Sequence, residues 1–549
     1  MNKTKLWIIL LGISLLYSLP GVGMLSAQTN NMQVMTYMSG EFAGSEFGRH
    51  IASIDFNGDG YTDLVAASPY WNPLLQYTLQ DYRGKLYFYW GGPGFDNIPD
   101  FVIEGSEDQH PIGRDLINGG DMNGDGIEDL VTIMNENGEC KLAVYFGRST
   151  PQATPDVVLT YPGVVGMLLN PLGDINGDEK SDISILSQYS LHQEVEIWTD
   201  IDEVPWLYYT TPNRNQLPRL CGIGDVNSDG FDDCILNTQV NSTGMSHNRI
   251  VLYYGSATFP IADSLVICED SSNTILKTWS CPVGDVNGDE YGDFTAGSLI
   301  YDHYSQHLWF GGADITAQWD VDLLSSWSGL ENSLSERGTG YPFIHGDLNG
   351  DGYEDVLSFN HEDGYYDGVM FVWMGGANMN GSMDYVRYSI TGYDAHNFGW
   401  SRATGDFNAD GYCDIAAGAP WWGPHNNHNE TGRVYILAGN ANLHETTTAN
   451  EDPLLVPPPQ LSIRVFPNPP QREEIVQMEI KTLSAPQGDQ AILRIFNSRG
   501  QKVYHQEHIT LSGKRTTLPL QLQDLANGVY ICQLQLGHTV NTTKLTIMK

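Results

Sequence analysis

The chain is poor in basic residues. Its 549 residues include 27 Lys and Arg against 67 Asp and Glu, which gives a formal net charge of −40 at pH 7. A protein with this balance repels a phosphate backbone, so we predict no nucleic-acid partner. Long apolar runs are also lacking. One run covers residues 6–19, which is short for a membrane span, and we expect no transmembrane segment beyond a signal peptide.

Catalytic signatures are lacking as well. The sequence contains no nucleophile elbow, no zinc signature and no phosphate-cradling loop. We therefore assign no catalytic residue and predict that the protein is not an enzyme.

Cysteine is scarce and follows no metal-binding pattern. There are seven cysteines, an odd number. Cys221, Cys234, Cys268 and Cys281 lie close enough in the sequence for a disulfide to form in an oxidising compartment. Buried free thiols are the alternative, and the sequence does not decide between the two.

One acidic motif is abundant. Asp-x-Asn-x-Asp-x-x-x-Asp occurs seven times, and we number the copies loops 1 to 7: residues 55–63, 121–129, 174–182, 225–233, 285–293, 347–355 and 406–414. A repeat at this spacing indicates one supersecondary unit used many times.

Each loop offers oxygen ligands to a hard cation such as calcium, which takes six to eight of them. We predict up to seven bound Ca²⁺ ions, held by the side chains at positions 1, 3, 5 and 9 and by the carbonyl of position 7. An Asp-rich turn without metal is the alternative. The predicted ligands are Asp55, Asn57, Asp59, Tyr61, Asp63; Asp121, Asn123, Asp125, Ile127, Asp129; Asp174, Asn176, Asp178, Lys180, Asp182; Asp225, Asn227, Asp229, Phe231, Asp233; Asp285, Asn287, Asp289, Tyr291, Asp293; Asp347, Asn349, Asp351, Tyr353, Asp355; and Asp406, Asn408, Asp410, Tyr412, Asp414.

The loops differ from the helix–loop–helix calcium site. That site requires an acidic residue at position 12, and none of the seven loops has one. A short apolar run follows position 9, as at residues 64–67, and is typical of a buried strand. The loops are therefore predicted to be β-hairpin tips. Glu179 and Glu290 replace Gly at position 6, so we expect loops 3 and 5 to bind more weakly if that position requires φ > 0.

The remainder of each unit has the pattern of further strands, several of which end in aromatic residues followed by Gly. Four strands per unit and seven units predict an all-β protein, a seven-bladed β-propeller with calcium-binding hairpin loops. Residues 33–38 have the pattern of an outer strand although no unit precedes them. We predict that they complete the last blade and close the ring.

At this point the chain resembles the FG-GAP repeat of integrin α-subunit propellers and bacterial surface proteins. The residues that carry the resemblance are Phe47-Gly48, Ala67-Ser68-Pro69, Phe398-Gly399 and Gly418-Ala419-Pro420, with Ile112-Gly113 as a looser match. The resemblance implies a calcium-bearing propeller, used mainly for adhesion and binding, and it does not name a ligand.

The two ends of the chain differ from the repeats. Residues 1–27 have the basic, apolar and small-residue regions of a secretory signal peptide. The propeller is predicted at residues 28–445, and the Thr- and Pro-rich residues 446–460 form a predicted linker. Residues 461–549 have the pattern of a small β-sandwich and resemble the C-terminal sorting domain of the type IX secretion system. This resemblance implies that the secretion machinery is a partner and that the protein is secreted or lies on the outer cell surface.

Aromatic residues gather in turns on the face expected to lie opposite the calcium loops. We predict a ligand site at Tyr70, Trp71, Trp421 and Trp422, because ring closure makes their two blades neighbours. These rings could instead pack their own loops. The predicted function is adhesion or binding to an extracellular protein or polysaccharide. The alternative is a polysaccharide-degrading lyase or glycosidase built on a calcium-bearing propeller.

Overall fold

The computed structural model divides the chain into two compact units, residues 1–452 and 453–549. The predicted signal peptide and linker lie outside the described residues, as do several turns. The structure describes residues 32–73, 82–105, 111–136, 139–211, 218–242, 245–258, 263–270, 280–300, 303–323, 344–360, 369–381, 384–388, 397–422, 431–443, 461–466, 477–482, 490–497, 501–510, 515–520, 525–526, 528–536 and 539–547.

The first unit consists of repeated four-stranded antiparallel sheets, which we number after the loop that each contains. Sheet 1 contains β2 (Ile51–Ile54), β3 (Asp63–Ser68), β4 (Lys85–Tyr89) and β5 (Phe101–Glu104). Sheet 2 contains β6 (Leu116–Asn118), β7 (Leu130–Glu136), β8 (Glu139–Tyr145) and β9 (Val157–Tyr161). Sheet 3 contains β10 (Gly166–Gly173), β11 (Asp182–Gln188), β12 (Gln193–Trp198) and β13 (Trp206–Thr210).

Sheets 4 to 7 repeat this order. Sheet 4 contains β14 (Arg219–Gly224), β15 (Asp233–Ser242), β16 (Met245–Tyr253) and β17 (Ser264–Asp270). Sheet 5 contains β18 (Ser280–Gly284), β19 (Asp293–Ile300), β20 (His303–Trp309) and β21 (Val321–Leu323). Sheet 6 contains β22 (Ile344–Gly346), β23 (Asp355–Asn360), β24 (Val369–Trp373) and β25 (Tyr385–Tyr388). Sheet 7 contains β26 (Arg402–Gly405), β27 (Asp414–Ala419), β28 (Arg433–Leu437) and, as its fourth strand, β1 (Val34–Ser39).

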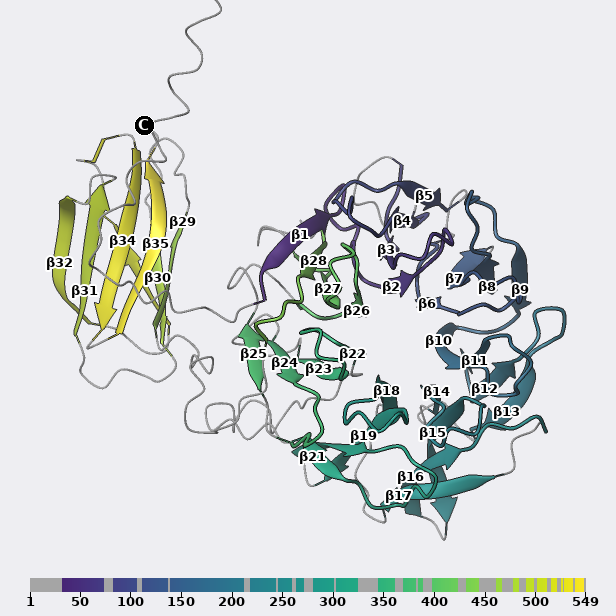
Figure 1. Ribbon diagram of the computed structural model, residues 1–549. Coiled ribbons are helices and arrows are strands. Elements are labelled where there is room, and N and C mark those ends of the chain that lie inside the picture. The colour runs from purple at the N-terminus through teal and green to yellow at the C-terminus, as the bar shows by residue number, and fades with distance from the viewer. Residues whose placement is uncertain are drawn as a thin grey trace, which may run out of the picture. The chain divides into compact units, whose positions relative to one another are not determined.

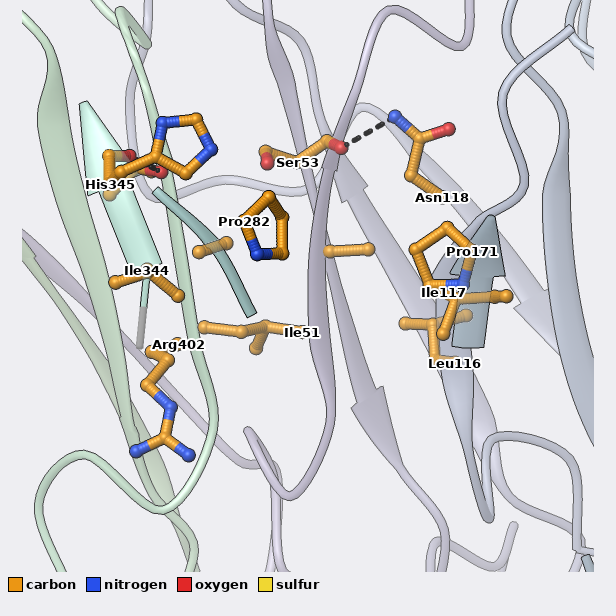
Figure 2. Close-up of a pocket in the computed structure, with 13 residues that line it drawn as sticks. Ile51, Ser53, Leu116, Ile117, Asn118, Pro171, Pro282, Ile344, His345 and Arg402 are labelled. Atoms are coloured by element: carbon orange, nitrogen blue, oxygen red, sulfur yellow. Dashed lines mark hydrogen bonds between the residues drawn. The ribbon is translucent and has the colours of Figure 1, made fainter. Parts of the chain in front are cut away.

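The sheets are arranged around a common centre, as in a propeller (Figure 1). The first strand of each sheet lies beside the first strand of the next, from β2 through β6, β10, β14, β18 and β22 to β26, and β26 lies beside β2. All of these strands except β14 border a central cavity (Figure 2). Apolar side chains fill the space between neighbouring sheets: Phe56 and Leu86 of sheet 1 pack with Leu130 and Tyr145 of sheet 2.

The two ends of the first unit meet in sheet 7. As the sequence predicts for residues 33–38, β1 pairs antiparallel with β28 and supplies the outer strand. Met38 is 2% exposed and packs in a cluster with Phe47 and Val434. The guanidinium of Arg433 lies 4.0 Å from the ring centre of Tyr37. The ends of the ring are therefore joined by backbone pairing and by a shared core.

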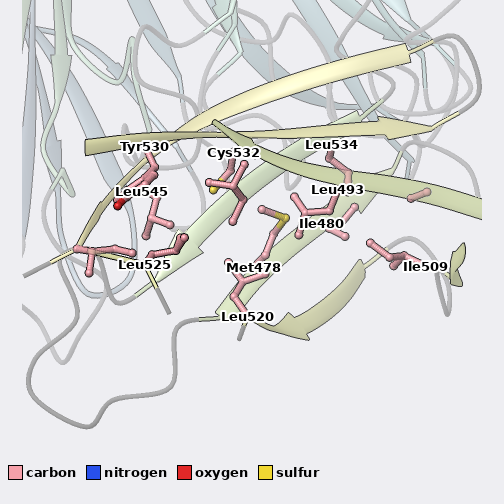
Figure 3. Close-up of a cluster of buried hydrophobic side chains, with 13 residues drawn as sticks. Met478, Ile480, Leu493, Ile509, Leu520, Leu525, Tyr530, Cys532, Leu534 and Leu545 are labelled. Atoms are coloured by element: carbon pink, nitrogen blue, oxygen red, sulfur yellow. The ribbon is translucent and has the colours of Figure 1, made fainter. Parts of the chain in front are cut away.

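The second unit is built from two sheets around one apolar core (Figure 3). One sheet contains β29 (Leu461–Phe466), β30 (Gln477–Thr482) and β33 (Arg515–Pro519). The other contains β32 (Lys502–Thr510), β31 (Gln490–Asn497), β34 (Gly528–Leu536) and β35 (Thr539–Ile547) in that order. Met478 and Ile480 from the first sheet pack with Leu493 and Leu534 from the second.

None of the seven cysteines forms a disulfide in the structure, which agrees with the second of the two alternatives that the sequence leaves open. Cys234 and Cys281 are buried, and burial raises the pKa of the Cys221 thiol to about 11. Among the described residues, no helix is long and apolar enough to cross a membrane.

The closing strand generates a first prediction. Met38→Ala should destabilise the first unit by about 2–5 kcal/mol, because it opens a cavity where β1 packs on sheets 1 and 7. Thermal unfolding of the purified chain measures this effect. Tyr37→Phe is the control, because it keeps the ring over Arg433 and removes an exposed hydroxyl, so it should change stability by about 0.5 kcal/mol or less. Equal melting temperatures for the two variants would contradict the proposed role of β1.

Candidate metal-binding loops and the opposite face

All seven acidic loops lie on the same face of the first unit. Each joins the first and second strands of its sheet, and position 9 lies at or next to the start of the second strand, as Asp63 does in β3 and Asp414 in β27. The turns that join the second and third strands lie on the opposite face, because neighbouring strands are antiparallel.

The first Asp of each loop organises the turn. In loop 1, Asp55 Oδ1 accepts hydrogen bonds from the amides of Gly58 (2.9 Å) and Asp59 (3.1 Å), and Asp55 Oδ2 accepts one from Gly60 (2.8 Å). The bonds from positions 5 and 6 recur in all seven loops. A short carboxylate thus pairs amides that a tight turn leaves without backbone partners.

The turn requires left-handed backbone conformations at positions 4 and 6. Position 6 has φ of 87° at Gly60, and the Glu residues that replace Gly there have φ of 68° (Glu179) and 70° (Glu290). Position 6 therefore does have φ > 0 in loops 3 and 5, which is the condition under which we expect these two loops to bind calcium more weakly. Position 4 was missed in the sequence, although it also has positive φ, including 58° at both Ser228 and Ala409.

The last Asp of each loop is fully buried. The side chains at position 9 are all 0% exposed: Asp63, Asp129, Asp182, Asp233, Asp293, Asp355 and Asp414. In loops 1 to 6, Oδ2 accepts a hydrogen bond of 2.9–3.1 Å from the amide of position 2, as from Phe56 in loop 1. Position 2 is apolar and buried in every loop, which pins the start of the turn to the core.

The other carboxylate oxygen explains the Gly that follows the third strand. Asp63 Oδ1 accepts a hydrogen bond from Gly91 (2.8 Å), and the equivalent bond, 2.8–3.0 Å long, occurs in loops 2, 4, 5, 6 and 7. A Cβ atom on Gly91 would lie 2.2 Å from the carbonyl oxygen of Thr62. Only Gly allows this approach. The aromatic–Gly pattern is visible in the sequence, but the hydrogen bond that this Gly donates to the buried Asp is seen only in the structure.

Loop 3 departs from this arrangement. Trp198 pairs with Ile183 in the same way that Tyr89 pairs with Leu64 in sheet 1. The residue two positions after Trp198 is Asp200, which therefore takes the place that Gly91 has in sheet 1. Asp182 Oδ1 is buried and has no hydrogen-bond partner in the structure. Loop 3 therefore combines an unpaired buried oxygen with the strained Glu at position 6.

Burial dominates the electrostatics of position 9. Desolvation raises the pKa of Asp63 to about 7, against the lowering effect of the hydrogen bond from Gly91. Desolvation likewise raises the pKa of Asp182 to about 8, and the neighbouring carboxylates of Asp178 and Asp174 add to the shift. Negative charge at these positions is costly without a nearby cation.

Among the residues that the structure describes, no group of three or more His, Cys, Asp or Glu side chains is gathered closely enough to hold a metal ion. In loops 2 to 7 the amide of the Asn at position 3 donates to the Asp at position 5 over 2.9–3.2 Å. The donors of each loop are still all oxygens of the kind that calcium prefers, and the buried oxygen of Asp182 lacks a partner. The residues fit a hard cation, and the ligand set stays a prediction.

Backbone hydrogen bonds connect the seven loops into a closed circle. In every sheet except sheet 3, the residue after the Gly that follows the third strand donates to the carbonyl of position 2 in the preceding loop. Gly92 donates to Phe407 over 2.9 Å and so joins sheet 1 to loop 7. Equivalent bonds join sheets 2, 4, 5, 6 and 7 to the loop before, and Ser181 joins loop 3 to Asp121 of loop 2 (2.8 Å).

The four predicted ligand residues do not form one cluster. Trp71 is 4% exposed and donates to Glu41 over 2.8 Å, so its position is that of a core residue. Trp422 is half-buried under Arg433, whose guanidinium lies 3.4 Å from the ring centre. The structure thus places these two rings against the protein itself.

Tyr70 and Trp421 are brought together around Arg49. The guanidinium of Arg49 lies 5.8 Å from the ring centre of Tyr70 and 5.6 Å from those of Trp400 and Trp421. All three rings are half-buried, and Trp400 meets Trp421 edge to face at 4.6 Å. Glu46 forms an ion pair with Arg49. Arg49 and Trp400 were missed in the sequence, although both lie within two residues of the Phe-Gly pairs.

Comparison with known families agrees with these features. The model of the FG-GAP repeat matches residues 47–89 and 398–437, and the model of the secretion system C-terminal sorting domain matches residues 464–548. The chain carries FG-GAP repeats and a type IX sorting domain. The sorting domain indicates export by type IX secretion to the cell surface or beyond it.

The curated relatives that the chain matches include integrin α-subunits. It is 27% identical to integrin alpha-4 of Xenopus laevis over 179 residues, which are 29% of this chain and 17% of the integrin. It is 34% identical to human integrin alpha-6 over 109 residues, 19% of this chain and 9% of the integrin. The match thus spans less than a fifth of the length of these integrins.

Three solved structures are similar at low identity. PorZ, a surface component of the type IX secretion system of Porphyromonas gingivalis, has a TM-score of 0.34 and 12% identity, and the match covers 91% of this chain and 59% of PorZ. The rhamnogalacturonan lyase YesX has a TM-score of 0.35 and 12% identity, with 74% of this chain and 73% of the lyase covered. The Dos1 propeller has a TM-score of 0.36 and 8% identity, with 74% of this chain and 95% of Dos1 covered. Similarity at this level does not bear on activity.

The close approach at the third strand generates a second prediction. Gly147→Ala should lower the melting temperature of the first unit, at a cost of about 1–3 kcal/mol, because its Cβ would lie 2.2 Å from the Glu128 carbonyl oxygen. The matched control is Gly94→Ala, where no atom lies within 4 Å of the added Cβ. Differential scanning calorimetry of both variants checks this. A Gly147→Ala protein as stable as the control would show that the contact is not required.

Proposed function

We propose that residues 28–445 form a seven-bladed β-propeller whose seven hairpin loops bind calcium, and that this secreted propeller binds an extracellular protein or polysaccharide. The observation that carries the proposal is the closed circle of seven loops, each folded around the same set of oxygen donors. The sorting domain at residues 464–548 adds the route by which the protein leaves the cell.

Calcium would be held by the residues at positions 1, 3, 5, 7 and 9 of each loop, the predicted ligand set. Once bound, the ion would supply positive charge beside carboxylates that are otherwise destabilised by burial. The Asp residues at positions 1, 5 and 9 of the seven loops make up 21 of the 67 acidic residues, so the effect of bound calcium on the net charge of −40 is large. Loops 3 and 5 are proposed to bind least tightly because of the strain at Glu179 and Glu290.

The ligand is proposed to bind on the face opposite the calcium loops. Burial of Trp71 removes it from the predicted site, and the half-buried rings of Tyr70, Trp421 and Trp400 around Arg49 take its place. Half-buried aromatic rings around a cation offer both stacking and charge to a partner. Trp422 lies under Arg433, whose guanidinium also lies over Tyr37 of the closing strand β1.

The alternative is a polysaccharide lyase or glycosidase. A specific arrangement in its favour lies in sheet 5, where His307 Nδ1 and Asp322 Oδ1 are 2.7 Å apart and His307 stacks on Trp319 at 4.0 Å. Such a pair can serve acid–base chemistry. Depolymerisation of a polysaccharide would separate this alternative from binding alone.

Binding tests the proposal directly. The purified chain, immobilised with calcium, should retain at least one member of a panel of matrix proteins and polysaccharides, with no loss of polymer length. Replacing Tyr70 and Trp421 by Ala should weaken that binding about tenfold or more, because aromatic anchors dominate binding energy. Trp206→Ala is the matched control, since Trp206 lies on β13 and is 49% exposed.

Three outcomes would contradict parts of the proposal. Equal loss with Trp206→Ala would place the site elsewhere. Shortening of the polymer would establish the enzyme alternative. A calcium-loaded, folded chain that retains nothing from the panel would contradict a binding function of this kind.

A further inference from the structure

We propose that the central cavity of the propeller binds a small carboxylic acid with an apolar body. The cavity has a volume of about 350 Å³ and lies where the first strands of the sheets meet (Figure 2). This volume falls in the range of small-molecule sites. The site is distinct from the aromatic residues around Arg49.

The walls of the cavity are apolar. Ile51, Leu116, Ile344, Pro171 and Pro282 line it from five different first strands. The two prolines carry no backbone N–H, so these strand edges lack a donor where they face the cavity. Ile51 and Leu116 are buried, whereas Pro171 is exposed and Pro282 and Ile344 are half-buried, so an apolar ligand body would cover apolar surface that is otherwise in contact with water.

Two of the polar side chains that line the cavity, Asn118 and Thr404, bond to the backbone. The amide of Asn118 donates to the Ser53 carbonyl over 3.1 Å (Figure 2). The hydroxyl of Thr404 donates to the His345 carbonyl over 2.6 Å. These groups already have partners, so a ligand rich in hydroxyls would gain little from them. This favours a hydrocarbon body over a sugar.

Charge differs between the two ends of the cavity. Arg402 lies at one end, and His345, Ser53 and Asn118 lie at the other (Figure 2). His345 is two residues before loop 6, and its Nδ1 lies 2.8 Å from the carboxylate of Glu354. The acidic loops are thus close to the His345 end and repel an anion there.

Arg402 marks the end where an anion would be favoured. It begins β26, four residues before loop 7, and so faces away from the acidic loops. Its guanidinium donates to the Gly399 carbonyl (3.2 Å) and lies 5.8 Å from the ring centre of Phe359, which hold the side chain in place. A guanidinium with five N–H donors matches a carboxylate well. In the inferred pose, the carboxylate of the ligand lies at Arg402 and its apolar chain extends through the cavity toward the His345 end.

Calorimetry with octanoate and octanol tests the pose on the calcium-loaded, full-length secreted chain. Octanoate should bind. Octanol, which has the same chain length without the charge, should bind at least about tenfold more weakly. Arg402→Gln should reduce octanoate affinity about tenfold and leave octanol unchanged. Arg249→Gln is the matched control, since Arg249 pairs with Glu269 on the outer part of sheet 4 and should change neither.

A second variant keeps the test informative if Arg402→Gln fails to fold. Ser53→Leu adds an apolar side chain to the cavity wall and should weaken octanoate and octanol together by occupying the space. Equal affinity for the two probes, or octanoate binding that survives both variants, would overturn the assignment. So would absence of octanoate binding by a chain whose melting transition shows that it is folded.

Discussion

The structure of the first unit depends on a carboxylate that is fully buried at the end of each acidic loop. Each of these seven Asp side chains is 0% exposed, and in most loops it accepts one amide hydrogen bond from its own loop and one from the Gly after the third strand. The following residue then donates to the neighbouring loop. One side chain therefore links the turn, the third strand and the next sheet, and this link is repeated around the ring.

Repetition explains why much of this architecture could be predicted from the sequence. Seven copies of one motif indicated seven hairpins on one face, and the structure has seven four-stranded sheets in the described part of the first unit. The strand at residues 34–39 was predictable because it has an outer-strand pattern without a preceding unit. The positive φ at Glu179 and Glu290 followed from the Gly found in the other loops.

Long-range contacts were harder to predict. The burial of Trp71 depends on Glu41 and Lys85, which lie in separate segments and meet only in the fold. Arg49 and Trp421 are far apart in the sequence and meet because sheets 1 and 7 are neighbours. A composition-based view finds aromatic residues on a face, but it does not decide which rings pack inward.

The two faces of the first unit differ in the charged side chains that they carry. Acidic side chains concentrate in the loops on one face, whereas Arg49, Arg219, Arg402 and Arg433 lie at the ends of strands on the other. Calcium on the first face would offset the repulsion between the loop carboxylates there. The proposed ligand residues and the Arg402 end of the cavity both lie on that second side.

Calcium is proposed to complete the ligand sphere around the buried loop carboxylates. Isothermal titration of calcium into the chelator-treated chain, followed to about 10⁻³ M and combined with thermal unfolding, tests it most directly. The account predicts uptake of about five to seven ions, a large rise in melting temperature, and tighter binding after Glu179→Gly, which relieves the strain at position 6. No uptake, with an unchanged melting temperature, would show that the seven loops are acidic turns held by hydrogen bonds alone.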